Sequence, residues 1–261
     1  MKLRQLLSID GAVLVLLPII VLFSSLLWRP NFLISILLFL GLPVAYMVIR
    51  APKYILKTLI FSLIASIPLM IILEYIGQQS LSWAFPPSAF DSQFLGIINF
   101  EVLLWAFFNI LAIVLFYEFI FDHHRVPKPW HKKMWILVRY LAVWGIFFLL
   151  LFQITGGDIR LPYFYLLFGL IVFIYPILMT AFQYPRLLPK ILYTALYFAF
   201  LSLLYEIAAL KLGWWYFPGK EFIGYITILQ VTFPLEELFF WIILFAPAVV
   251  SAFEYLDDDH R

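Results

Sequence analysis

The residues best suited to chemistry are two adjacent glutamates, Glu236 and Glu237, inside the apolar segment Phe233–Phe240. A charged side chain at the centre of a membrane costs about 2.5–3.5 kcal/mol, so an ionisable residue in such a segment indicates function by default. Pro234 favours a helix start here, because proline suits the first turn and the helix dipole favours negative charge there. The alternative is that both glutamates only cap the helix.

Further acidic and aromatic residues extend this candidate site. A carboxyl group in an apolar environment can donate a proton, and a second carboxylate can take one back. The candidate catalytic residues are Glu236, Glu237, Glu206, Glu101 and Glu74. Aromatic faces attract positive charge without attacking it, which suits a site where a carbocation forms. The candidate substrate-binding residues are Trp214, Trp215, Tyr216, Phe239, Phe240 and Trp83. For the tryptophans, an interfacial aromatic belt is the alternative interpretation.

The composition indicates that these residues lie in a membrane protein. Of the 261 residues, 65% are hydrophobic and 12% are charged, which predicts a polytopic helical membrane protein. The absence of cysteine excludes disulfides, thiolate nucleophiles and cysteine-ligated metals. The net charge of +2 gives no argument for a nucleic-acid partner, and no glycine-rich phosphate loop indicates a nucleotide. We predict Asp122–Arg125 to be a solvated loop rather than a metal site. No cofactor or metal is therefore expected.

Eight apolar runs are long enough to span a bilayer, which takes about 20 residues in a helix. They cover residues 10–28, 31–49, 56–76, 97–121, 134–154, 161–182, 190–211 and 223–255. The last run is long for one span, so Phe222–Val231 is expected to be an interfacial or re-entrant piece before a break at Pro234. Most lysines and arginines fall in the segments that lie inside if the N-terminus is inside. Both termini are therefore predicted to be cytoplasmic, in a multi-pass protein of the cell membrane.

An internal repeat divides the chain into residues 1–125 and 126–261, with four predicted spans in each half. Segment 74–86 aligns with 206–218 at an offset of 132 residues, and at an offset of 136 Glu101, Trp105 and Glu118 align with Glu237, Trp241 and Glu254. Because each half has an even number of spans, the halves are expected to have the same orientation about an axis along the membrane normal. The predicted fold is all-α, with about eight transmembrane helices as two parallel four-helix repeats.

The first half carries a degenerate copy of the acidic motif. Ile98 stands opposite Pro234, and Phe100 stands opposite Glu236. Glu101 is either a second carboxylate of one shared site or a relic, and the sequence leaves both interpretations open.

At these residues the chain resembles the membrane-integral lycopene cyclase domain family, found as two small subunits or fused into one chain. The family pattern is an acidic residue, a W-x-F/Y segment, a glycine, P-x-E-E-x-x-F-F and a span ending near Tyr-Glu. It is matched here by Glu206, Trp214–Pro218, Gly224, Pro234–Phe240 and Glu254–Tyr255. The resemblance covers most of the chain at low identity and fits the fused form. Ile98–Glu101 departs from it, since fused members generally carry an intact acidic motif in each half.

The resemblance implies an isomerase of carotenoid biosynthesis that cyclises the end group of lycopene, or of a similar linear carotenoid, without redox change. Glu236 or Glu237 would protonate the terminal double bond, the next double bond would close a six-membered ring, and Glu206 or Glu101 would remove a proton. The expected partners are the bilayer and a lipid-soluble polyene, and a homo-oligomer is left open. The alternatives are a hydratase or cyclase of another isoprenoid, and a non-catalytic membrane binding or transport protein.

Overall fold

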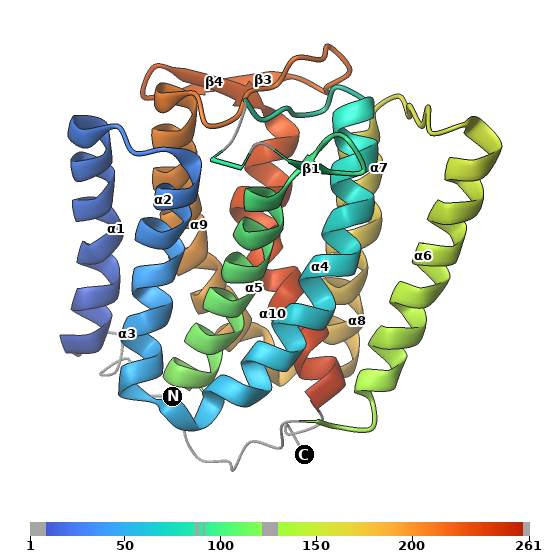
Figure 1. Cartoon of the computed structure of the whole chain (residues 1–261). Helices are drawn as coiled ribbons and strands as arrows, with labels where there is room; N and C mark the ends of the chain where they lie inside the picture. The colour runs from blue at the N-terminus through green and yellow to red at the C-terminus, as the bar shows by residue number, and fades with distance from the viewer. Residues whose placement is uncertain (1–8, 87–88, 91, 122–129, 258–261) are drawn as a thin grey trace.

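The computed structural model describes residues 9–86, 89–90, 92–121 and 130–257, and within them it has eight helices long and apolar enough to cross a membrane. These spans are Ile9–Trp28, Phe32–Arg50, Pro52–Gln79, Phe100–Phe121, Met134–Thr155, Phe164–Gln183, Pro185–Leu212 and Glu237–Leu256. The protein is therefore an all-α polytopic membrane protein, as its apolar runs predict. The eight spans lie side by side in one bundle (Figure 1).

Several spans are divided into shorter helical elements. In chain order the helices are α1 (Ile9–Trp28), α2 (Phe32–Ile36), η1 (Leu37–Gly41), α3 (Leu42–Arg50), η2 (Pro52–Tyr54), α4 (Ile55–Gln79), α5 (Phe100–Phe121), α6 (Met134–Thr155), α7 (Phe164–Gly169), η3 (Leu170–Ile174), α8 (Tyr175–Gln183), η4 (Pro185–Leu187), α9 (Leu188–Leu212), η5 (Glu237–Leu244) and α10 (Phe245–Asp257). Segments η1, η3 and η5 are π-helical, and η2 and η4 are 3₁₀ turns.

Two of the π-helical segments have a local cause in the sequence. Segments η1 and η3 are each followed within two residues by a proline, Pro43 in α3 and Pro176 in α8. A proline inside a helix has no N–H to donate and its ring clashes with the carbonyl four residues earlier. A locally widened π turn absorbs this interruption, so both spans cross the bundle without a break.

Two short antiparallel hairpins lie at the end of the bundle opposite to the first and last described residues (Figure 1). Strand β1 (Gln93–Phe94) pairs with β2 (Ile98–Asn99), and β3 (Tyr225–Ile228) pairs with β4 (Val231–Pro234). The predicted interfacial or re-entrant piece Phe222–Val231 is therefore mostly one strand and its turn. In β3, exposed and half-buried residues alternate, which is the period of a strand. The composition of this segment is nevertheless apolar, like that of the last span that follows it.

The order of elements recurs along the chain at a spacing of 133 residues. Segments η1 and η3, the 3₁₀ turns η2 and η4, and the 25-residue helices α4 and α9 are each related by this shift. Each long helix is then followed by a hairpin and one further span. Helix α5 lies inside the bundle and packs against α3, α4, α9 and α10, whereas α6 is largely exposed and packs mainly against α4.

Candidate functional site

A small cavity of about 40 Å³ is lined by six aromatic side chains, a methionine and a carboxylate. The six, which we call the aromatic box, are Trp83, Phe85, Trp105, Trp215, Phe217 and Trp241, and the other two lining residues are Met70 and Glu237. The box consists of three pairs that the sequence alignment matches between the two halves, Trp83 with Trp215, Phe85 with Phe217, and Trp105 with Trp241. The rings of Trp105 and Trp241 lie 5.2 Å apart, so matched residues meet in space.

Glu237 is the carboxylate among the described residues that line this cavity. It is the first residue of the π-helical segment η5, a type of distortion that is frequent at functional sites. The Tyr165 hydroxyl donates a hydrogen bond to its Oε2. Its carboxyl group also lies within interaction range of the carboxyl group of Glu206. Two buried carboxyl groups this close repel each other when both are ionised, so the pair is suited to hold a proton at the wall of the box.

Glu206 is fixed from its other side by the box itself. The indole Nε1 of Trp215 lies 3.2 Å from both carboxylate oxygens of Glu206. Glu206 is only 2% exposed, near the end of helix α9. Because the indole holds Glu206 and the phenol holds Glu237, the carboxyl pair has a defined orientation toward the cavity.

Glu236, the neighbour of Glu237, has a different role. It is fully buried, and its Oε1 accepts a hydrogen bond of 2.7 Å from the backbone N–H of Ile223. It thus fastens the segment before strand β3 to the start of the last span. Helix begins directly after Pro234, which is the last residue of β4, so both glutamates do lie in the first helical turn as predicted.

Glu101 corresponds to Glu236 in its contacts. It is also fully buried, and its Oε1 accepts a hydrogen bond of 2.7 Å from the backbone N–H of Ala89, before strand β1. The sequence alignment matches Glu101 with Glu237, whereas these contacts match it with Glu236, one residue earlier in the chain. Helix α5 starts as a regular α-helix where η5 is π-helical, and a π turn accommodates one extra residue. The extra residue explains why Trp105 matches Trp241 at an offset of 136 although Glu101 matches Glu236.

Glu74 repeats the position of Glu206 but not its partner. Its Oε2 accepts a hydrogen bond of 2.8 Å from the indole Nε1 of Trp83, and its Oε1 accepts one from the Gln78 amide. Gln78 also donates to the backbone oxygen of Ile97 at 2.9 Å. Glu74 itself is not among the residues that line the box.

The predicted substrate-binding aromatics divide into two groups. Trp83 and Trp215 line the box, and the other four do not. Phe240 is buried against Gly169, where a Cβ would fall 2.3 Å from its ring. Trp214 donates its Nε1 to the backbone oxygen of Pro30, Tyr216 is half exposed, and Phe239 is 45% exposed. The sequence missed Tyr165, Met70, Phe85, Trp105, Phe217 and Trp241 as site residues. Both tryptophans and both phenylalanines were detectable as repeat-matched aromatics, whereas Tyr165 and Met70 had no signal.

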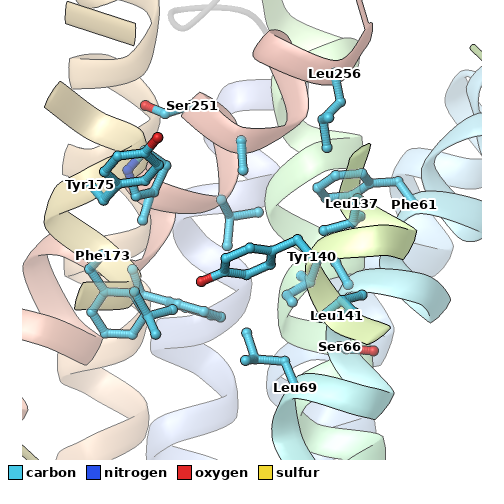
Figure 2. Close-up of a pocket in the computed structure, with 18 of the residues that line it drawn as sticks. Phe61, Ser66, Leu69, Leu137, Tyr140, Leu141, Phe173, Tyr175, Ser251 and Leu256 are labelled. Atoms are coloured by element: carbon cyan, nitrogen blue, oxygen red, sulfur yellow. The ribbon is translucent and has the colours of Figure 1, made fainter. Parts of the chain in front are cut away.

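A second, larger cavity of about 410 Å³, the lateral cavity, adjoins the box among α4, α5, α6, η3, α8, η5 and α10. Figure 2 shows its lining, with Tyr140 reaching across the space between Leu137 and Phe173. Met70 and Trp241 line both cavities, so the two cavities are neighbours at these side chains. Methionine is flexible, and its movement would join the box to the lateral cavity.

Comparison of the chain with protein-family models, curated proteins and solved structures finds no match. Residues 122–125, predicted as a solvated loop, lie outside the described residues. The candidate site is therefore defined by its own geometry. Two neighbouring buried carboxyl groups, held by an indole and a phenol, adjoin an aromatic box inside a membrane bundle.

Proposed function

We propose that the protein is a cofactor-independent isomerase that closes a ring at the end of a linear carotenoid such as lycopene by acid catalysis. The observation that carries this proposal is Glu237 on the wall of an aromatic box, with the carboxyl group of Glu206 beside it. Carboxylic acids can protonate a carbon–carbon double bond, and aromatic faces can stabilise the cation that results. The resemblance of the Pro234–Phe240 segment to lycopene cyclase domains agrees with this chemistry.

The reaction needs one proton to be given and one to be taken back. Glu237 donates its proton to the terminal double bond, which leaves a tertiary cation. The electron pair of the next suitable double bond attacks this cation and closes a six-membered ring, moving the positive charge onto the ring. The carboxylate now present in the Glu206–Glu237 pair removes a proton from the adjacent ring carbon, which forms a new double bond. Substrate and product have the same mass, and the pair regains its original proton count.

The rest of the site supports the cation and excludes water. The indole rings of Trp83, Trp105, Trp215 and Trp241 line the space next to Glu237. Water would trap a carbocation as an alcohol, so a dry aromatic wall favours ring closure over hydration. Glu206 acts as the proton-sharing partner of Glu237, and Tyr165 positions the donor carboxyl group.

The proposal extends to the organisation of the chain. We propose that residues 1–125 and 126–261 are duplicated halves, related by an axis along the membrane normal, with both termini in the cytoplasm. The recurring element order supports this. So does the backbone pairing of Ala84 with Tyr216, residues that the alignment matches, through hydrogen bonds of 2.9 and 3.0 Å. A residue pairing antiparallel with its own counterpart is what a two-fold axis requires.

The alternatives differ in product. A hydratase would add water to the same cation, so its product would be heavier by the mass of water. A non-catalytic carrier would use the chain from Tyr165 through Glu237 to Glu206 to move protons and would leave every polyene unchanged.

The test is expression in a bacterium that accumulates lycopene, with pigments separated by chromatography and weighed by mass spectrometry. We expect an isomer of unchanged mass and blue-shifted absorption, because the double bond left in the ring is twisted out of the conjugated chain or moved out of it. The product should disappear with Glu237→Gln and persist with Glu101→Gln, which changes a buried carboxylate that is not among the residues lining the box. Unchanged lycopene, with the protein shown to be in the membrane, would overturn the assignment.

A further inference from the structure

We infer that a linear isoprenoid chain enters this protein sideways from the bilayer, between α6 and the η3–α8 segment, and lies in the lateral cavity with its end in the aromatic box. This inference rests on the proposed function for the identity of the ligand and adds its route and its binding site.

The lateral cavity is suited to a hydrocarbon chain. Its volume of about 410 Å³ lies in the range of ligand pockets, about 300–1,000 Å³. Its lining is almost entirely aliphatic and aromatic, and no charged side chain is among the described residues that line it. A lipid headgroup would find no counter-charge there, whereas an uncharged polyene brings no polar group of its own that needs a partner.

The mouth of the cavity is defined by the lining residues that remain exposed. These are Ile136 and Tyr140 on α6, Ile171 on η3 and Tyr175 on α8, which are 43–64% exposed. All four lie within spans, so this opening faces the hydrocarbon of the bilayer rather than water. Helix α6 is the least enclosed span, with 11% of its apolar window buried, and it packs mainly against α4. The bundle is therefore open on the side where a lipid-soluble chain arrives.

The inner end of the cavity leads to the proposed acid. Met70 and Trp241 line both cavities, and Glu237 lies on the far side of them in the aromatic box. The Trp241 ring lies 5.4 Å from Phe173 of the lateral cavity and 5.2 Å from Trp105 of the box, so it joins the two linings. The box alone, at about 40 Å³, cannot hold a cyclising end group. An arriving chain must displace the flexible Met70, which makes the end of the chain the part that reaches Glu237.

Two neighbouring residues of η3 provide a matched test of the mouth. Ile171 lines the cavity and Leu170 does not, yet both are about half exposed, at 51% and 45%. Ile171→Trp should obstruct the mouth, and Leu170→Trp should place the same ring in the lipid. Ala248→Phe, deeper in the cavity lining, fills the space itself. Because Ile171 is exposed, we expect Ile171→Trp to fold. This variant therefore still tests the route if Ala248→Phe does not fold.

The measurement is the polyene absorbance that co-purifies with each variant from lycopene-accumulating cells, together with conversion in those cells. We expect Ile171→Trp and Ala248→Phe to lower both by at least fivefold, and Leu170→Trp to leave both at wild-type level.

Binding and conversion separate this inference from the proposed function. If wild-type protein retains polyene in a manner that depends on Ile171 but forms no product, the route stands and cyclisation fails. If Ile171→Trp and Ala248→Phe bind and convert like wild type, the route is wrong. Recovery of phospholipid instead of polyene from the purified protein would also overturn it, because the cavity would then be a lipid site.

Discussion

The chain contains two glutamate–tryptophan pairs that are alike in spacing and bonding, Glu74 with Trp83 and Glu206 with Trp215. In both, the indole nine residues later donates to a buried carboxylate. They differ in the second partner of that carboxylate, which is the Gln78 amide in the first and the carboxyl group of Glu237 in the second. An amide donates a hydrogen bond but has no acidic proton to give. The framework is therefore present twice, and the pair of neighbouring carboxyl groups once.

This difference between the two pairs arises at the start of the last span in each half. Glu101 and Glu236 make the same backbone contact, each fastening the segment that precedes a hairpin. Only the second half then has an additional residue, Glu237, in a π-helical segment where the first half has a regular helix. Function and framework can thus be separated by mutating matched residues in the two halves.

The largest effect is expected for Glu237 itself. Glu237→Gln keeps the size of the side chain and removes its proton, so we expect conversion to fall at least 100-fold; the double variant Glu236→Gln/Glu237→Gln should abolish it. General acid catalysis typically contributes about 10²–10⁴-fold. The measurement is product per membrane-inserted protein, and wild-type product from either variant would contradict the mechanism.

The two halves can next be compared directly through Glu206 and Glu74. Glu206→Gln removes the carboxyl group that shares a proton with Glu237 in the proposed mechanism, so we expect conversion to fall about 10–100-fold, less than for the acid itself. Glu74→Gln changes an equally buried carboxylate that is not among the lining residues of the box, and conversion should stay within about threefold of wild type on the same scale. Equal losses in the two variants would mean that both halves act in the reaction.

Much of the fold could be predicted from the sequence, because eight apolar runs of sufficient length give eight spans. The exception is informative. Strands β3 and β4 are apolar enough to extend the last run, and hydropathy alone does not separate a short hairpin from a helix. In the structure, the hairpin is identified by the alternating exposure of the residues in β3 and by the two consecutive positive φ angles at Leu229 and Gln230.

The candidate site was predictable in part, for reasons that particular residues make clear. Glu237, Glu206 and the box tryptophans Trp83 and Trp215 could be found from carboxylates and aromatics in apolar segments. The adjacent Trp214 could not be separated from Trp215, because the direction of each indole depends on the loop that carries it. Tyr165 lies 72 residues from Glu237 in sequence, and a contact of that kind arises only when the spans pack.

Tyr165 should show an intermediate effect. Tyr165→Phe removes the hydroxyl that donates to Glu237, and such a hydrogen bond is worth about 0.5–1.5 kcal/mol, or about twofold to tenfold in rate if it holds the acid in place. The matched control is Tyr197→Phe, another buried tyrosine, whose hydroxyl donates instead to the backbone oxygen of Leu14. We expect slower conversion in the first variant only, with similar thermal stability in both. Equal rates would mean that the phenol does not orient the acid.

The smallest difference is expected where the halves are most alike. Glu101→Leu and Glu236→Leu each remove the acceptor of one backbone N–H, that of Ala89 or Ile223, and leave it without that partner. Losing the partner of such a group costs about 1–3 kcal/mol, so both variants should unfold at a similarly lowered temperature in detergent. If the two losses match while Glu237→Gln leaves stability unchanged, the first glutamate of the acidic motif is structural and the second is chemical. A much larger loss of conversion than of stability in Glu236→Leu would instead place Glu236 in the reaction beside Glu237.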